Sequence, residues 1–174
     1  MKKLFALLLA VIMVMSMATI VSAETTTLTT EVPPASYTLN VPVEYEVDFG
    51  ATITRIGRIS VTDSNNFAAG KNLKVTITYD DFKAENISTT IPFTLECPYG
   101  PQEYYTENIS SGSSIVFKGN QTGKVDEFAY ASSPQGTESS LGDLKVIIDS
   151  KDWGKALAGA YTAVITYTCE VVVE

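Results

Sequence analysis

The chain has 174 residues, with 20 acidic against 12 basic side chains and no histidine. A net charge of −8 argues against a nucleic-acid partner, because binding to phosphates requires a basic surface. The absence of histidine removes the commonest general base and metal ligand, so the sequence predicts no catalytic site, no metal site and no cofactor. A calcium site at Asp63, Asn65 and Asn66 is the alternative.

The N-terminus has the pattern of a secretory signal peptide, residues 1–23. Lys2 and Lys3 precede the apolar residues 4–15, and small residues lead to Ala23. A membrane anchor is the alternative, but polar residues interrupt the run and no second apolar stretch follows. Cleavage leaves 10 basic against 20 acidic residues. We therefore expect a secreted or extracellular bacterial protein without membrane association after cleavage.

The chain that follows begins with a leader and three segments of strand pattern. Residues 24–35 are rich in Thr and Pro, which favours a flexible or edge-strand leader. Residues 36–174 are expected to form a single β-sandwich domain. Within it, residues 37–41 and 43–49 alternate apolar and polar side chains like two strands. Residues 52–61 hold a further strand, with a bulge or break near its glycine.

The second half continues with short alternating segments. They are residues 73–79, 91–97, 115–118, 128–131, 144–148 and 161–171. A Ser- and Gly-rich stretch, residues 132–142, is expected to be a mobile loop, and residues 152–158 a short helical turn. Eight or nine strands without a long helix predict an all-β fold, an antiparallel two-sheet sandwich of immunoglobulin-like type. A closed barrel is the alternative architecture.

Cys97 and Cys169 each occupy the apolar phase of a predicted strand, so both are expected to point into the core. Export makes a disulfide between them chemically possible, and it would close a loop of roughly 70 residues and stabilise by about 4 kcal/mol. Two free buried thiols are the alternative. Two cysteines without histidine offer too few ligands for a zinc site.

Three tyrosines make the connection after Cys97 the best candidate contact surface. Tyr99, Tyr104 and Tyr105 stand in a Pro- and Gly-containing loop, residues 97–105. Rigid aromatic faces of this kind stack on sugars or anchor a protein partner. The alternative is that the rings cover the open end of the sandwich.

The last strand carries a family resemblance. Residues 158–162 (AGAYT), followed by Ile165, Thr166 and Tyr167, resemble the closing strand of WxL-type and pilin-like bacterial surface domains. Residues 37–41 and 50–61 are similar to segments of uncharacterised secreted β-sandwich proteins of Gram-positive bacteria. The Trp-x-Leu elements of WxL domains are absent, since Trp153 is followed by Gly and Lys, and peptidoglycan binding does not carry over.

The resemblance and the missing catalytic residues together favour a non-catalytic secreted or cell-surface interaction protein, adhesin-like or a structural subunit. Its partner would be a protein or a glycan at the cell surface. No sortase-type signal follows the last strand, so any surface association is expected to be non-covalent. A carbohydrate-binding module that uses the tyrosine loop is the alternative function.

Overall fold

A computed structural model describes residues 33–173 of the chain. The predicted signal peptide and nearly all of the leader lie outside the described residues. The described part is mostly β structure, with fourteen strands, one 3-10 turn and one short helix. The strands are β1 (Ser36–Asn40), β2 (Ile53–Gly57), β3 (Ser60–Asn65), β4 (Lys71–Tyr79), β5 (Phe82–Ala84), β6 (Ile87–Ile91), β7 (Thr94–Tyr99), β8 (Tyr105–Ile109), β9 (Ser113–Phe117), β10 (Tyr130–Ser132), β11 (Glu138–Ser140), β12 (Leu144–Ile147), β13 (Tyr161–Thr162) and β14 (Ile165–Val173). The 3-10 turn is η1 (Pro101–Glu103) and the helix is α2 (Ser150–Trp153).

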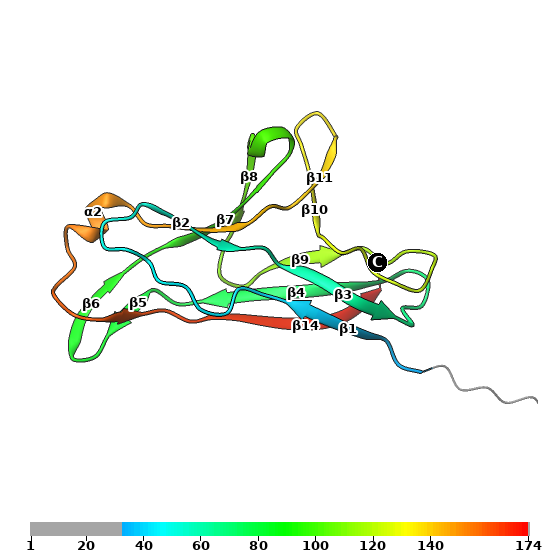
Figure 1. Cartoon of the computed structure of the whole chain (residues 1–174), viewed down its shortest axis with the longest axis horizontal. Coiled ribbons are helices and arrows are strands. Elements are labelled where there is room, and N and C mark those ends of the chain that lie inside the picture. Colours follow the sequence, from blue (N-terminus) through cyan, green and yellow to red (C-terminus); the bar gives the residue numbers. More distant parts are fainter. Residues whose placement is uncertain (1–32, 174) are drawn as a thin grey trace, which may run out of the picture. The chain divides into compact units, whose positions relative to one another are not determined.

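The strands form five small sheets, and every strand pairing is antiparallel. The largest sheet has the order β2-β12-β7-β8, and a second has the order β14-β4-β9. The sheet β13-β5-β6 and the pairs β1-β3 and β10-β11 complete the set. In Figure 1, β2 and β7 run above β4 and β14, and the two hairpins β7-β8 and β10-β11 project from the upper side.

The core draws on both of the larger sheets. Leu73, Val75 and Ile77 of β4 are fully buried, because β4 is the middle strand of its sheet and one of its faces is covered. From the other sheet, Leu95 of β7 and Leu144 of β12 belong to the same buried cluster. Alternation with a period of two places these side chains on one face of each strand, as the sequence predicts.

Several predicted elements differ from the structure. The count of eight or nine strands is too low, because short pairs such as β5-β6 and β10-β11 form from segments with weak alternation. The predicted mobile loop at residues 132–142 contains β11, and the Oγ of the buried Ser133 accepts a hydrogen bond from Thr137 N at 3.1 Å. Residues 43–49, predicted to be a strand, form none.

The helical turn lies earlier in the chain than predicted. It spans residues 150–153 instead of 152–158. Asp149 is the N-terminal cap, since its Oδ1 accepts a hydrogen bond from Lys151 N at 2.9 Å. The Trp153 indole then donates to the Ala51 carbonyl at 2.8 Å, which fixes the helix beside the start of β2.

Candidate functional site

Residues 41–49 form an extended-looking connection that exposes apolar side chains. Val43 is 90% exposed and Phe49 83%, while Tyr45 is 56% exposed. No strand includes these residues, and the only backbone hydrogen bond of the segment within the described part is from Ala51 N to Asp48 O. Pro42 contributes to this, because it has no N–H to donate to a ladder.

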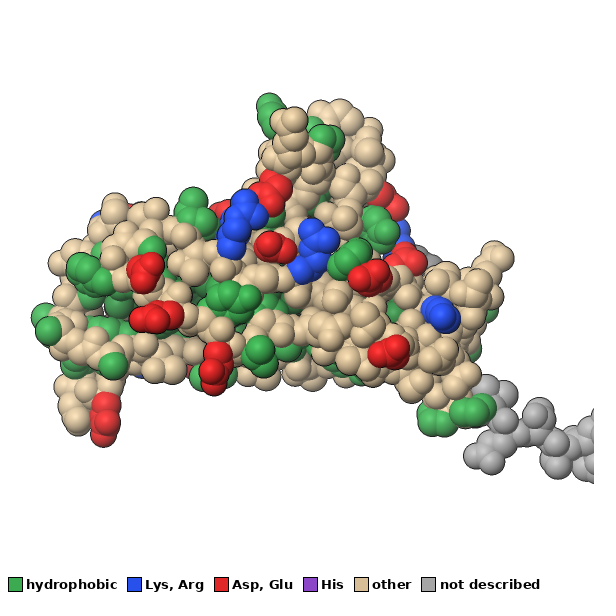
Figure 2. Space-filling model, in the orientation of Figure 1, with side chains coloured by type: hydrophobic (Ala, Val, Ile, Leu, Met, Phe, Trp, Pro, Cys, Tyr) green, Lys and Arg blue, Asp and Glu red, His purple; other side chains and the backbone are tan. Residues whose placement is uncertain are grey.

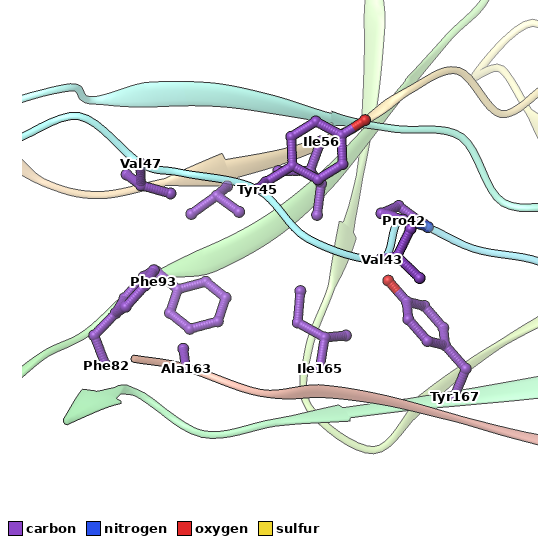
Figure 3. A pocket seen from close by; sticks show the side chains of 11 residues that line it. Pro42, Val43, Tyr45, Val47, Ile56, Phe82, Phe93, Ala163, Ile165 and Tyr167 are labelled. Atoms are coloured by element: carbon purple, nitrogen blue, oxygen red, sulfur yellow. The ribbon is translucent and has the colours of Figure 1, made fainter. Parts of the chain in front are cut away.

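A small apolar hollow of about 120 Å³ lies beneath this segment. Figure 3 shows its two walls, with Tyr45 and Val47 from the segment on one side and Ala163 and Ile165 on the other. It is lined by Pro42, Val43, Tyr45, Val47, Ile56, Phe82, Phe93, Val146, Ala163, Ile165 and Tyr167. Ile56, Phe93 and Val146 are core residues, so the hollow opens the core to solvent along this side.

A larger hollow of about 950 Å³ continues from the first toward α2. The two share lining residues from the segment, from β5 and from the approach to β14. The larger one is lined by Glu44, Tyr45, Glu46, Val47, Phe49, Phe82, Ile91, Trp153, Ala156, Leu157, Ala158, Gly159, Ala160, Tyr161, Thr162 and Ala163. We call the two hollows together the β14 groove. Figure 2 shows this side of the molecule, on the left, with apolar patches among acidic side chains.

Strand β14 contributes the inward-facing side chains of Ile165 and Tyr167 to the groove. It bonds to β4 over nine residue pairs on one edge, and no described strand pairs with its other edge. Its register with β4 begins at Ile165, and the preceding residues 163 and 164 interrupt the ladder, which leaves Val164 67% exposed. An unpaired strand edge offers a row of N–H and C=O groups to another chain.

Tyr167 of β14 adds a polar group inside the groove. Its hydroxyl is buried and has no hydrogen-bond partner among the described residues. Figure 3 shows it pointing toward Val43. Burial, with a smaller contribution from the Cys97 thiol, raises the pKa of Tyr167 to about 12, so the hydroxyl stays protonated and can donate. A backbone carbonyl in the groove would satisfy it.

The predicted tyrosine site is not a flat platform. Tyr99 is buried and its hydroxyl donates to Ser132 O at 3.3 Å, while Tyr105 stacks on Tyr99 with centroids 5.5 Å apart and rings inclined by 29°. Tyr104 is 81% exposed and meets Tyr105 edge-on at 78°. The structure therefore brings the three rings together but exposes one of them fully.

A network of charges holds the turn that carries Tyr104. Glu103, at φ 57°, accepts hydrogen bonds from both terminal nitrogens of Arg55, at 2.8 and 2.7 Å, and from Lys145 at 3.0 Å. These bonds lower the pKa of Glu103 to about 2. The arrangement ties the β7-β8 hairpin to β2 and β12, which is a structural role.

The predicted disulfide is wrong, because both cysteines are free. Cys97 belongs to the sheet of β7 and Cys169 to the sheet of β14, and the Cys97 thiol lies 4.0 Å from the Gly142 carbonyl oxygen. Burial raises the pKa of Cys97 to about 12, so it is an inert core thiol. Cys169 lies close to Tyr37, whose pKa is raised by burial and by this thiol.

Comparison with known proteins adds no relative: no family model matches the chain, and neither a curated protein nor a solved structure does. Among residues 33–173, no three His, Cys, Asp or Glu side chains are grouped so that they could hold a metal ion. The same part of the chain contains no helix long and apolar enough to cross a membrane.

Sequence reasoning missed the β14 groove as a site. The alternation of residues 43–49 was visible, but it predicts a buried strand and not an exposed wall. The signal that could have found it is Pro42 next to an alternating segment that also carries Glu44 and Glu46. Chemically, the groove combines apolar walls, an unpaired strand edge and two carboxylates, a combination suited to holding an extended polypeptide.

Proposed function

We propose that this chain is a non-catalytic interaction protein that binds an extended segment of a partner protein in the β14 groove. The segment would add to the free edge of β14 as a further strand, with its backbone bonded to β14 and its alternate side chains among the apolar walls. This is recognition by strand addition, in which main-chain hydrogen bonds give affinity and side-chain pockets give specificity.

One observation carries the proposal. A segment with the alternating pattern of a strand, residues 41–49, lies unbonded across from a strand with a free edge, and core residues line the space between. Natural proteins usually protect such edges, and an exposed apolar patch beside one favours a binding partner. The proposal also includes export through the predicted signal peptide, and a location outside the cell or on its surface.

The architecture that we propose for this protein is an immunoglobulin-like sandwich of two layers, open along the β14 groove. The single buried cluster shared by the sheets of β4 and β7 supports it. A closed barrel is less compatible with the free edge of β14, since closure pairs every edge.

The carbohydrate alternative has weaker support. Sugar stacking at the tyrosine loop calls for two exposed and nearly coplanar rings, whereas Tyr104 alone is fully exposed and stands edge-on to Tyr105. Saturable binding on a glycan array, lost in Tyr104→Ala without loss of fold, would favour this alternative and count against the strand proposal.

The test uses a peptide of about ten residues that alternates Val and Thr, a length typical of a strand. We expect saturable binding, with slower hydrogen exchange at the amides of residues 41–49 and 165–173. The same peptide methylated at alternate backbone nitrogens should bind far less, because it cannot form a ladder.

Matched variants locate the peptide. Val43→Asp should abolish binding without unfolding the protein, since this side chain is almost fully exposed. Val116→Asp, on the outer face of β9, is the control and should bind normally. Absence of binding by the unmodified peptide, or equal loss in both variants, would overturn the proposal.

A further inference from the structure

We infer that the strand received by the β14 groove is basic, alternating apolar residues with Lys or Arg; this inference rests on the proposed function. The lining of the groove contains only two charged side chains, Glu44 and Glu46, and no Lys or Arg. An occupant therefore meets apolar walls and negative charge.

Neither carboxylate is neutralised within the protein. The ion pairs among the described residues lie elsewhere, and none of them includes Glu44 or Glu46. Glu103, by contrast, has both Arg55 and Lys145 as partners. Both side chains are exposed, so their carboxylates are accessible to a cation carried by an added strand, and salt screens the attraction.

The spacing of the two carboxylates fits alternate residues of a strand. Glu44 and Glu46 are two residues apart, so along an extended chain they lie about 7 Å from each other. Basic side chains at positions i and i+2 of an added strand repeat at the same interval and point to one face. The added strand is bonded to β14, so these cations meet the two carboxylates across the groove and not within a ladder.

The same charges argue against residues 41–49 of a second copy as the occupant, since that segment contains no Lys or Arg. If residues 41–49 of two copies paired antiparallel about Tyr45, Glu44 of each would lie opposite Glu46 of the other, and like charges directly opposite each other destabilise a sheet. The leader, residues 24–32, contains two Glu and no Lys or Arg, so it is equally unsuited. The basic partner strand is the occupant that the charges favour.

Three peptides of about ten residues test the inference: one alternates Val and Lys, one Val and Thr, one Val and Glu. Trp153 is the only tryptophan and lines the groove, so its fluorescence reports binding. At low salt we expect the Lys peptide to bind about fivefold more tightly than the Thr peptide, with the Glu peptide weakest, and the preference to shrink as salt is added.

Charge variants assign the preference to the groove. The double variant Glu44→Gln, Glu46→Gln should bind the Thr peptide as before but lose the preference for the Lys peptide. The double variant Glu44→Lys, Glu46→Lys should prefer the Glu peptide instead. Glu107→Gln with Glu127→Gln, exposed carboxylates outside the groove lining, is the control and should keep the preference.

The outcomes separate the two proposals. Equal binding of all three peptides would overturn the basic strand and leave strand addition standing, whereas no binding by any peptide would overturn both. A further control is a Lys peptide of the same composition whose Val and Lys residues do not alternate. If it binds equally well, the interaction is an unspecific charge attraction and the inference is overturned. If ultracentrifugation shows a concentration-dependent dimer that is lost in Val43→Asp, the occupant of the groove is a second copy of this chain and the basic-strand inference is overturned.

Discussion

Residues 41–49 and strand β4 carry the same alternation of apolar and polar side chains, yet only β4 forms a ladder. β4 lies between β14 and β9, and its inward side chains are fully buried. In residues 41–49 the corresponding side chains are exposed at Val43, Tyr45 and Phe49, with Val43 90% exposed, and Val41 and Val47 are only half-buried. Alternation determines which face of a segment is apolar, whereas the available partner edges decide whether a strand forms.

The difference has local causes. Pro42 removes one donor at the start of residues 41–49, and Gly50, at φ 81°, turns the chain at the end. β4 has neither residue type within its nine positions. A segment that alternates like a strand but forms no ladder marks a place where another chain can add a strand.

The largest expected difference is in the free energy of unfolding, between a truncated side chain in β4 and one in residues 41–49. Leu73→Ala in β4 should lower the free energy of unfolding by about 2–5 kcal/mol, because it leaves a cavity in the closed core. Val43→Ala should change it by less than about 0.5 kcal/mol, because the side chain is exposed. Urea unfolding of the two variants measures both. A cost at Val43 close to that at Leu73 would mean that residues 41–49 are paired in solution.

Sequence reasoning predicted the closed region of the molecule well. β1, β4, β9 and β12 appear close to their predicted positions, whereas the predicted strand 91–97 is divided between the end of β6 and β7, and the predicted strand 161–171 between β13 and β14. The break near Gly57 is confirmed, since β2 ends there at φ 100° and β3 starts at Ser60. These features depend on local pattern and turn chemistry, which a single sequence contains.

The open region could not be predicted in the same way. That residues 43–49 would stay unpaired depends on where the edge of β14 lies, which is a non-local fact. The cysteines show the same limit: both pack in or against the core as predicted, but they lie on different sheets and do not pair. A period of two determines which face of the strand a side chain occupies. It does not determine which residue that side chain meets on the facing sheet.

Two glycine variants sharpen the comparison at the groove. Gly57 and Gly50 both have positive φ, but a Cβ at Gly57 would lie 3.1 Å from the Tyr45 hydroxyl, while one at Gly50 would meet nothing within 4 Å. Gly50→Ala should therefore cost only backbone strain, about 1 kcal/mol, and Gly57→Ala about 2 kcal/mol. Thermal unfolding measures both, and equal costs would show that Tyr45 does not rest on β2 in solution.

The paired Glu103 should make the stability of the protein depend on pH in the acidic range. The pKa of Glu103 is lowered from 4.5 to about 2, so its stabilising contribution is complete above pH 4.5 and is lost as the pH falls toward 2. Glu103→Gln should lower the melting temperature slightly at neutral pH and flatten its decline over this window; the effect is small because the pairs are exposed. An identical decline in the parent protein and in Glu103→Gln would contradict the assignment.

The smallest effect on stability is expected at Phe49. Its ring is 83% exposed and touches Trp153 edge-on, with centroids 5.4 Å apart. Phe49→Ala should change the free energy of unfolding by no more than about 0.5 kcal/mol, yet shift the Trp153 emission to longer wavelength, because water gains access to one side of the indole. Val116→Ala, on β9, is the control and should leave the emission unchanged. If Phe49→Ala left the emission unchanged as well, residues 41–49 would not lie against α2 in solution, and the wall of the groove would be absent.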